Sequence, residues 1–158
     1  TIANMIARQL QIANQELILV NHGNAIGNDE LVFDFCGIPS LSLQKTNVLE
    51  YHSSHDEPSL IIPSELEKAS KSIDHMFNLL ELDHTPSSMQ KVPIYLTRFG
   101  LYNDFITQQK NYYITADILS LIDGEKSVLE ISDQLSLPFE IVNKVVHGLY
   151  LTGAYKRR

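Results

Sequence analysis

The first twenty residues contain two different patterns of apolar and polar positions. Residues 2–13 repeat apolar side chains at three- and four-residue spacing, which predicts an amphipathic helix with Arg8, Gln9 and Gln11 on its polar side. The apolar positions are Ile2, Ile6, Ala7, Leu10 and Ala13. Residues 17–20 then form a short continuous apolar run, which is typical of a strand buried on both faces. A helix followed by such a strand indicates an α/β layer.

A second helix–strand pair follows a polar loop. Glycines and asparagines make residues 23–30 a loop, and Asn28 or Asp29 can cap a short helix that ends at Gly37. Residues 38–43 alternate apolar and small polar side chains, which predicts another strand.

The clearest helix signal is a capping box, Ser64 to Glu67, directly after Pro63. The helix that it begins is expected to bury one face, made of Leu66, Ala69, Ile73, Met76, Phe77 and Leu80.

The last third of the chain carries a different pattern. Thr115 can cap one helix, Ser127 and Glu130 form a capping box for a second, and Pro138 suits the start of a third that ends at Gly153. A strand could follow from Ala154. Short helices joined by a tight turn are typical of a helix-turn-helix, so we expect a small winged-helix-like α domain here.

These segments predict an α/β fold class with three parts. Residues 1–85 form a partial α/β layer, in the order helix, strand, loop, helix, strand, loop, helix. Residues 86–112 are rich in aromatic side chains and serve as an ordered connector, and residues 113–158 form the winged-helix-like domain.

Composition narrows the function classes. The chain has 158 residues and a net charge of -7, and this acidic balance argues against nucleic acid as the main partner. No apolar run reaches membrane-spanning length, so no membrane partner is expected.

The single cysteine, Cys36, excludes an intrachain disulfide and suits a reducing cytoplasm. Its apolar neighbours predict a buried, inert thiol.

The candidate chemistry lies in the loop of residues 50–57. It places His52, His55 and several carboxylates beside Tyr51, and such side chains bind divalent metals or move protons. We interpret His52 as a metal ligand and Tyr51 as its catalytic neighbour, whose hydroxyl can donate to an oxyanion. The alternative is a polar surface loop. Two further histidines, at positions 75 and 84, are interpreted as solvated or locally hydrogen-bonded.

The order of these motifs resembles the last third of the zinc aminopeptidase family that uses two co-catalytic metals. The series runs from Gly27-Asn28-Asp29-Glu30 through Gly37-Ile38-Pro39 and Tyr51-His52-Ser53-Ser54-His55-Asp56 to a capped helix. It is closer to a bacterial subgroup that carries a C-terminal winged helix, because Arg98-Phe99-Gly100-Leu101-Tyr102 resembles the connector of that subgroup with one extra residue.

The resemblance implies roles for individual residues. His52 corresponds to the last metal-binding histidine of the family, and Tyr51 to the neighbour that steadies the tetrahedral intermediate. Gly27, Asn28 and Asp29 correspond to the loop that faces the substrate, although Asn28 stands where serine is usual. The implied cofactor is zinc, as two ions, and the implied substrate is a peptide or a small amide.

The family's other metal ligands and its general base, a glutamate, would lie before the part seen here. Since a catalytic zinc site usually needs three protein ligands, we expect this chain to be the C-terminal portion of a larger hydrolase. Its partner would be the missing N-terminal part of the same protein. Residues 1–85 would then belong to an exopeptidase-type α/β domain.

Two alternatives stay open. One is a non-catalytic binding module of the same fold in a biosynthetic pathway, and the other is a winged-helix DNA-binding regulator. The presumed recognition helix presents Glu140, Asn143, Lys144 and His147, and its opposite charges make a poor phosphate-binding surface. We therefore favour protein contact or packing within the chain for this helix, and a homo-oligomer is also left open.

Overall fold

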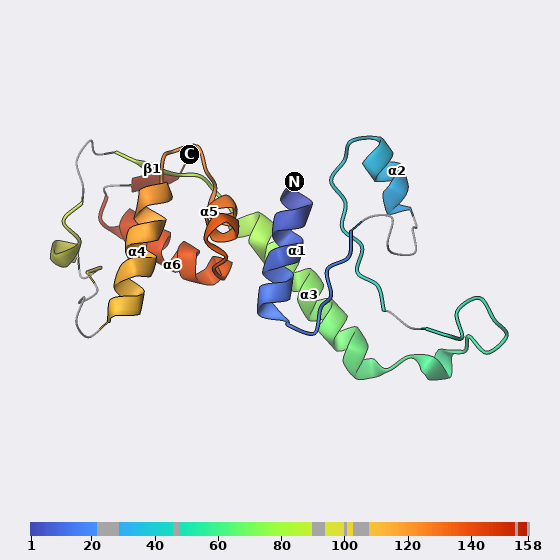
Figure 1. Cartoon of the computed structure of the whole chain (residues 1–158). Helices are drawn as coiled ribbons and strands as arrows, with labels where there is room; N and C mark the ends of the chain where they lie inside the picture. Colours follow the sequence, from blue (N-terminus) through green and yellow to red (C-terminus); the bar gives the residue numbers. More distant parts are fainter. Residues whose placement is uncertain are drawn as a thin grey trace.

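The computed structural model describes residues 1–21, 29–45, 48–89, 94–99, 101–102, 108–153 and 155–157. Helices make up most of the regular structure (Figure 1). In chain order the elements are α1 (Ile2–Ala13), α2 (Glu30–Phe35), η1 (Pro58–Leu60), α3 (Pro63–Leu82), β1 (Pro86–Ser88), η2 (Leu96–Phe99), α4 (Gln109–Leu121), α5 (Val128–Leu135), α6 (Phe139–Leu151) and β2 (Tyr155–Arg157).

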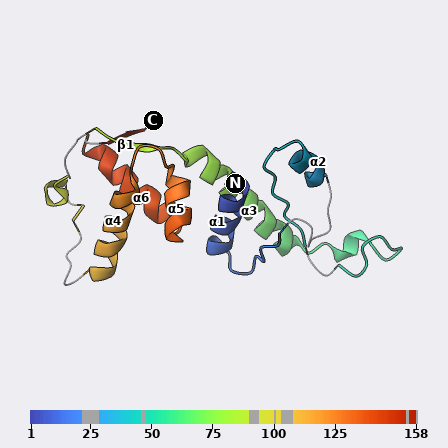
Figure 2. The ribbon, with the colours of Figure 1, turned by 45° about the horizontal axis from the view of Figure 1, so that its top comes forward.

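The elements gather into two regions joined by α3. At one end α1, the last turns of α3, α4, α5, α6 and the β1–β2 pair lie together, and we call this the helical unit (Figures 1 and 2). At the other end lies α2 with the irregular chain on either side of it. We call the described residues between 18 and 62 the arm, and none of them is buried.

One hydrophobic core holds the helical unit together. It is formed by Ile6, Leu10, Leu79, Ile118, Val128, Leu129, Ile131, Phe139, Val142 and Val146. The predicted amphipathic helix at residues 2–13 is confirmed as α1, and it contributes Ile6 and Leu10 to this core. Burying apolar surface of this kind is the main favourable term in folding.

Buried Gln9 ties α1 to the turn between α5 and α6. Its side-chain Nε2 donates to the carbonyl of Leu137 at 3.0 Å, and its Oε1 accepts from the backbone N–H of Phe139 at 2.8 Å. Only 2% of Gln9 is exposed. The prediction that Gln9 lies on the polar side of its helix is therefore wrong, because its amide satisfies two backbone groups that the turn leaves open.

An ion pair lies beside this contact. The Arg8 guanidinium makes two hydrogen bonds to the Asp133 carboxylate on α5, one of them from Nη2 to Oδ2 at 2.7 Å. These bonds raise the pKa of Arg8 above the ordinary value of an arginine. A bidentate pair of this kind fixes the orientation of the two helices as well as their distance.

The ends of the tail helices follow the sequence signals closely. Ser127 accepts from the backbone N–H of Glu130, whose side chain accepts from the backbone of Ser127, so the second capping box is confirmed. Pro138 is the N-cap of α6, and β2 follows Gly153. α4 begins at Gln109, however, and Thr115 is a buried residue inside it rather than its cap.

The predicted α/β fold class is wrong, because the described residues form mostly helices and one sheet of two strands. In that sheet β1 and β2 pair antiparallel, with Ser87 opposite Lys156. Residues 17–20 and 38–43 are irregular, and Ile18 is 76% exposed. Their apolar patterns suit strands, but a strand also needs a neighbour for its backbone hydrogen bonds, and no described segment provides one.

α3 exists as predicted but differs at its start and on its apolar face. Pro63 takes the first helical position and Ile62 is the N-cap, so the Ser64–Glu67 capping box does not form. Leu66 and Phe77, which were expected on the buried face, are 60% and 59% exposed. Leu79, which was not expected on that face, is buried. Cys36 is also exposed rather than buried.

The order α4, α5, α6 and β2 is consistent with the expected winged-helix-like domain. The division at residues 85 and 112 stays a prediction. Hydrogen bonds connect the predicted parts to one another. β1, in the connector, pairs with β2 in the last part, and the Asp83 carboxylate in the first part accepts from the backbone N–H of Leu129 at 2.8 Å.

Candidate functional site

The loop that carries Tyr51 and His52 is ordered by its own hydrogen bonds. Ser53 lies at its centre: its backbone N–H and its hydroxyl both donate to the carbonyl of Glu50, at 3.0 and 2.6 Å. The same hydroxyl accepts from the backbone N–H of His55 at 3.1 Å, and the Ser53 carbonyl accepts from that of Asp56 at 3.2 Å. The loop is therefore a series of tight turns, which fixes the direction of the side chains that it presents.

Tyr51 and His52 form a stacked pair on this loop. Their ring centroids are 4.0 Å apart and their planes differ by 29°. His52 has φ of 63°, in the left-handed region that side-chain-bearing residues rarely adopt. Such backbone strain costs about 1–3 kcal/mol and gathers at functional sites. Both rings are exposed, so together they present an imidazole and a phenol to whatever approaches the loop.

The described residues of this chain do not complete a zinc site around His52. No group of three His, Cys, Asp or Glu side chains among them converges well enough to hold a metal ion. His55, Asp56 and Glu57 follow closely in sequence, yet they do not form such a group of three with His52. The exposed imidazole of His52 suits one metal ligand, and three protein ligands are usual.

The predicted substrate loop is described only at its end. Gly27 and Asn28 lie outside the described residues. Asp29 is exposed and is the N-cap of α2, where its carbonyl accepts from the backbone N–H of Val32 at 3.0 Å and its side chain makes no capping bond. Its carboxylate is therefore available for another contact.

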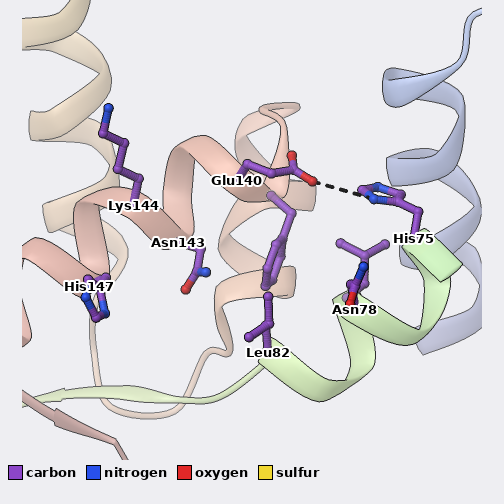
Figure 3. A pocket seen from close by; sticks show the side chains of 9 residues that line it. His75, Asn78, Leu82, Glu140, Asn143, Lys144 and His147 are labelled. Atoms are coloured by element: carbon purple, nitrogen blue, oxygen red, sulfur yellow. Dashed lines mark ion pairs between the residues drawn. The ribbon is translucent and has the colours of Figure 1, made fainter.

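A second group of polar side chains lies in a cleft between α3 and α6 (Figure 3). The sequence analysis expected His75, which lies there, to be solvated or locally hydrogen-bonded, and its pairing with α6 corrects that expectation. His75 of α3 pairs with Glu140 of α6, with 3.7 Å between Nδ1 and Oε1. Asn143, Lys144 and His147 continue the same wall of the cleft. The sequence already showed these residues as the polar face of the presumed recognition helix. Nothing in the sequence near His75 indicated that it would pair with this face.

His84, the other histidine beyond the loop, is locally hydrogen-bonded as predicted. Its Nδ1 donates to the carbonyl of Leu82 at 2.7 Å. Its Nε2 and the hydroxyl of Tyr150 are buried and have no hydrogen-bond partner among the described residues, and the two rings lie 5.4 Å apart. Burial raises the pKa of the Tyr150 hydroxyl.

Three comparisons bear on what the chain is similar to. No protein-family model matches it, and no curated protein matches it. It is similar to a crystal structure from Clostridium acetobutylicum of a protein described as a candidate peptidase, with a TM-score of 0.72 and 18% sequence identity. The match covers 99% of this chain and 36% of that protein, so this chain spans about a third of the other's length.

That likeness shows a fold shared with part of a peptidase-like protein. Because it covers 99% of the chain, it includes the arm as well as the helical unit. Separately, none of the described helices has the length and apolar character needed to cross a membrane.

Proposed function

We propose that this chain is part of a zinc-dependent, aminopeptidase-like hydrolase that removes the N-terminal residue from a peptide or a related amide. The observation that supports this best is the exposed Tyr51–His52 pair, held by a strained backbone within a fold similar to that of a candidate peptidase.

Tyr51 is proposed as an oxyanion donor. Amide hydrolysis passes through a tetrahedral intermediate with a negative oxygen, and a phenol O–H directed at that oxygen stabilises charge that the substrate lacks. Stacking on His52 restricts the ring of Tyr51 before the substrate arrives. His52 is proposed to supply one ligand of the zinc site, and loop residues Gly27, Asn28 and Asp29 to face the substrate.

The remaining ligands and the general base are proposed to come from a partner segment that covers the arm. The arm exposes many large apolar side chains, among them Leu19, Val20, Ile38, Leu41 and Leu43. An apolar surface of this extent on a soluble chain usually marks an interface. We propose that the remaining part of a longer protein packs against these apolar side chains and buries them.

Aminopeptidase activity of the longest natural chain that contains this sequence tests the proposal. With zinc and an amino-acid anilide as substrate, Tyr51→Phe should lower kcat on the order of a hundredfold or more, as the loss of one oxyanion donor does, and change KM little. Tyr95→Phe is the matched control at another exposed tyrosine. Equal turnover in the two variants would remove Tyr51 from the mechanism.

A second matched pair examines His52. His52→Gln should abolish zinc-dependent activity, whereas His55→Gln, three residues further along the same loop, should leave it unchanged. A parent protein that hydrolyses no amide with zinc present, yet still binds peptides, would instead favour the binding module.

The regulator alternative is less favoured by the geometry. A recognition helix must present its polar face to a DNA groove, whereas here Glu140 pairs with His75 of α3 and Asn143 lines the cleft between the two helices. We propose a docking role for the winged-helix-like unit and, from the single cysteine, a cytoplasmic location.

A further inference from the structure

The turn that presents the Tyr51–His52 pair runs from Glu50 to Ser53. The carbonyl of Glu50 accepts from the backbone N–H of Ser53 at 3.0 Å, which closes a β-turn with Tyr51 and His52 as its two central residues. The φ of His52 is 63°, whereas that of Tyr51 is not positive. A positive φ at the second central position alone is the pattern of a type II turn, and glycine or asparagine usually occupies that position. A histidine there therefore depends on neighbouring contacts to hold its backbone.

The hydroxyl of Ser53 supplies two such contacts. It donates to the same carbonyl of Glu50 at 2.6 Å, and it accepts from the backbone N–H of His55 at 3.1 Å. One side-chain oxygen therefore connects the residue before the Tyr51–His52 pair with a residue after it. The backbone bond of Ser53 alone does not select the turn, because the same bond also closes a type I turn, whose second central residue has a negative φ.

The relative position of the two rings depends on which turn forms. A change from type II to type I rotates the peptide between the central residues and reverses the sign of φ at His52. The rings of Tyr51 and His52, whose centroids lie 4.0 Å apart, would then leave the backbone in different relative directions. Packing does not prevent this change, because both residues are exposed and lie outside the core. The hydrogen bonds of the loop therefore set the direction of the two rings.

We propose that Ser53 is the positioning residue of the Tyr51–His52 pair and acts through its side-chain hydroxyl. The hydroxyl holds His52 in the left-handed conformation and thereby keeps the imidazole and the phenol stacked before a ligand arrives. This role rests on the hydrolase function proposed above. Ser53 itself contacts neither the metal nor the substrate in this assignment, so its effect on turnover passes entirely through the two rings.

NMR of the whole chain tests the conformation without any catalysis. A positive φ brings the amide proton of a residue closer to its own α-proton than a negative φ does, so His52 should give a strong NOE between these two protons. Ser53→Ala should reduce this NOE to that of ordinary loop residues, whereas Ser53→Thr, which keeps the hydroxyl, should retain it. Ser54→Ala, at the next exposed hydroxyl of the loop, is the matched control. An unchanged His52 NOE in Ser53→Ala would overturn the proposal.

Turnover of the longest natural chain that contains this sequence tests the consequence for catalysis. Ser53→Ala should lower kcat roughly tenfold, the equivalent of one or two neutral hydrogen bonds, and change KM little. Ser53→Thr should restore kcat, and the thermal unfolding temperature should be the same in all variants because the loop lies outside the core.

The two measurements separate this proposal from the hydrolase function. Loss of the His52 NOE in Ser53→Ala with a kcat equal to that of Ser54→Ala would contradict a positioning role in catalysis. A parent chain that hydrolyses no amide would contradict the hydrolase function, and the NOE comparison would still decide whether Ser53 positions the pair.

Discussion

Leu66 and Leu79 lie on the same helix, about 20 Å apart along its axis, in opposite environments. Leu79 is 1% exposed in the core of the helical unit, whereas Leu66 is 60% exposed near the arm. The helical unit buries its apolar side chains by itself, and the arm does not. The difference shows that one helix carries two kinds of apolar surface, one that is buried in the fold of this chain and one that is exposed and that we propose contacts a partner.

The largest effect that separates the two regions should come from the two leucines themselves. Leu79→Ala should lower the free energy of unfolding by about 2–5 kcal/mol, because it removes buried methyl groups and leaves a cavity. Leu66→Ala, the same change on the same helix, should stay within about 0.5 kcal/mol. Urea denaturation of both variants measures this, and equal losses would mean that α3 is packed along its whole length.

The next effect concerns the contact that joins α1 to the helical unit. Gln9→Ala leaves the Leu137 carbonyl and the Phe139 N–H without their partner, which should cost about 1–3 kcal/mol. Gln15→Ala, at an exposed position just beyond α1, is the control. A cost for Gln9→Ala no larger than that of the control would show that water replaces the side chain.

Ion pairs give a smaller contrast. A double-mutant cycle on Arg8 and Asp133, whose side chains are 49% and 21% exposed, should yield a coupling energy near 1 kcal/mol, the upper end for exposed pairs. The same cycle on Glu67 and Lys71, which are more exposed and lie within α3, should yield about 0.3–0.5 kcal/mol. A reversed order would show that the contact between α1 and α5 is loose.

The smallest effect is a dependence on pH in the turn between α4 and α5. The Lys126 side chain, together with the backbone N–H groups of Lys126 and Glu125, holds the pKa of Asp123 well below its usual range. Because the folded pKa is depressed, this contribution is fully present above the unfolded pKa of about 3.9 and is lost as the pH falls further. Thermal unfolding below pH 4 should respond less to acid in Asp123→Asn than in the control Asp74→Asn.

The helices could be predicted because their signals are local. Spacing defined α1, a complete capping box defined the start of α5, and Pro138 and Gly153 marked the limits of α6. Gln9 was misplaced because hydropathy alone assigns an amide to the solvent side, whereas its two partners lie far along the chain in the turn before α6.

The strand expected from Ala154 is present as β2 (Tyr155–Arg157), whereas the two strands predicted earlier in the chain are absent, because strand formation depends on a neighbour. Residues 17–20 and 38–43 have the apolar pattern of strands, but their backbone groups find no ladder in the described part of this chain. The same reasoning applies to the site. The residue types of Tyr51 and His52 were visible in the sequence, whereas their stacking and the left-handed backbone of His52 arise from the turns around Ser53.

Only the α6 side of the α3–α6 cleft could be predicted from the sequence. The helical spacing of Glu140, Lys144 and His147 placed them on one face of α6. Nothing near them in sequence indicates that His75 lies opposite, because that pairing depends on how α3 packs at the edge of the core.

Hydrogen exchange of the whole chain, followed by mass spectrometry, tests the division between helical unit and arm most directly. Backbone amides in α5 and α6 should exchange only through global unfolding, because they belong to buried, hydrogen-bonded helices. Peptides from residues 29–45 and 48–62 should exchange within seconds, since these residues have few buried contacts. Protection of the arm comparable to that of α5 and α6 would contradict the account, because the arm would then be stable without a partner.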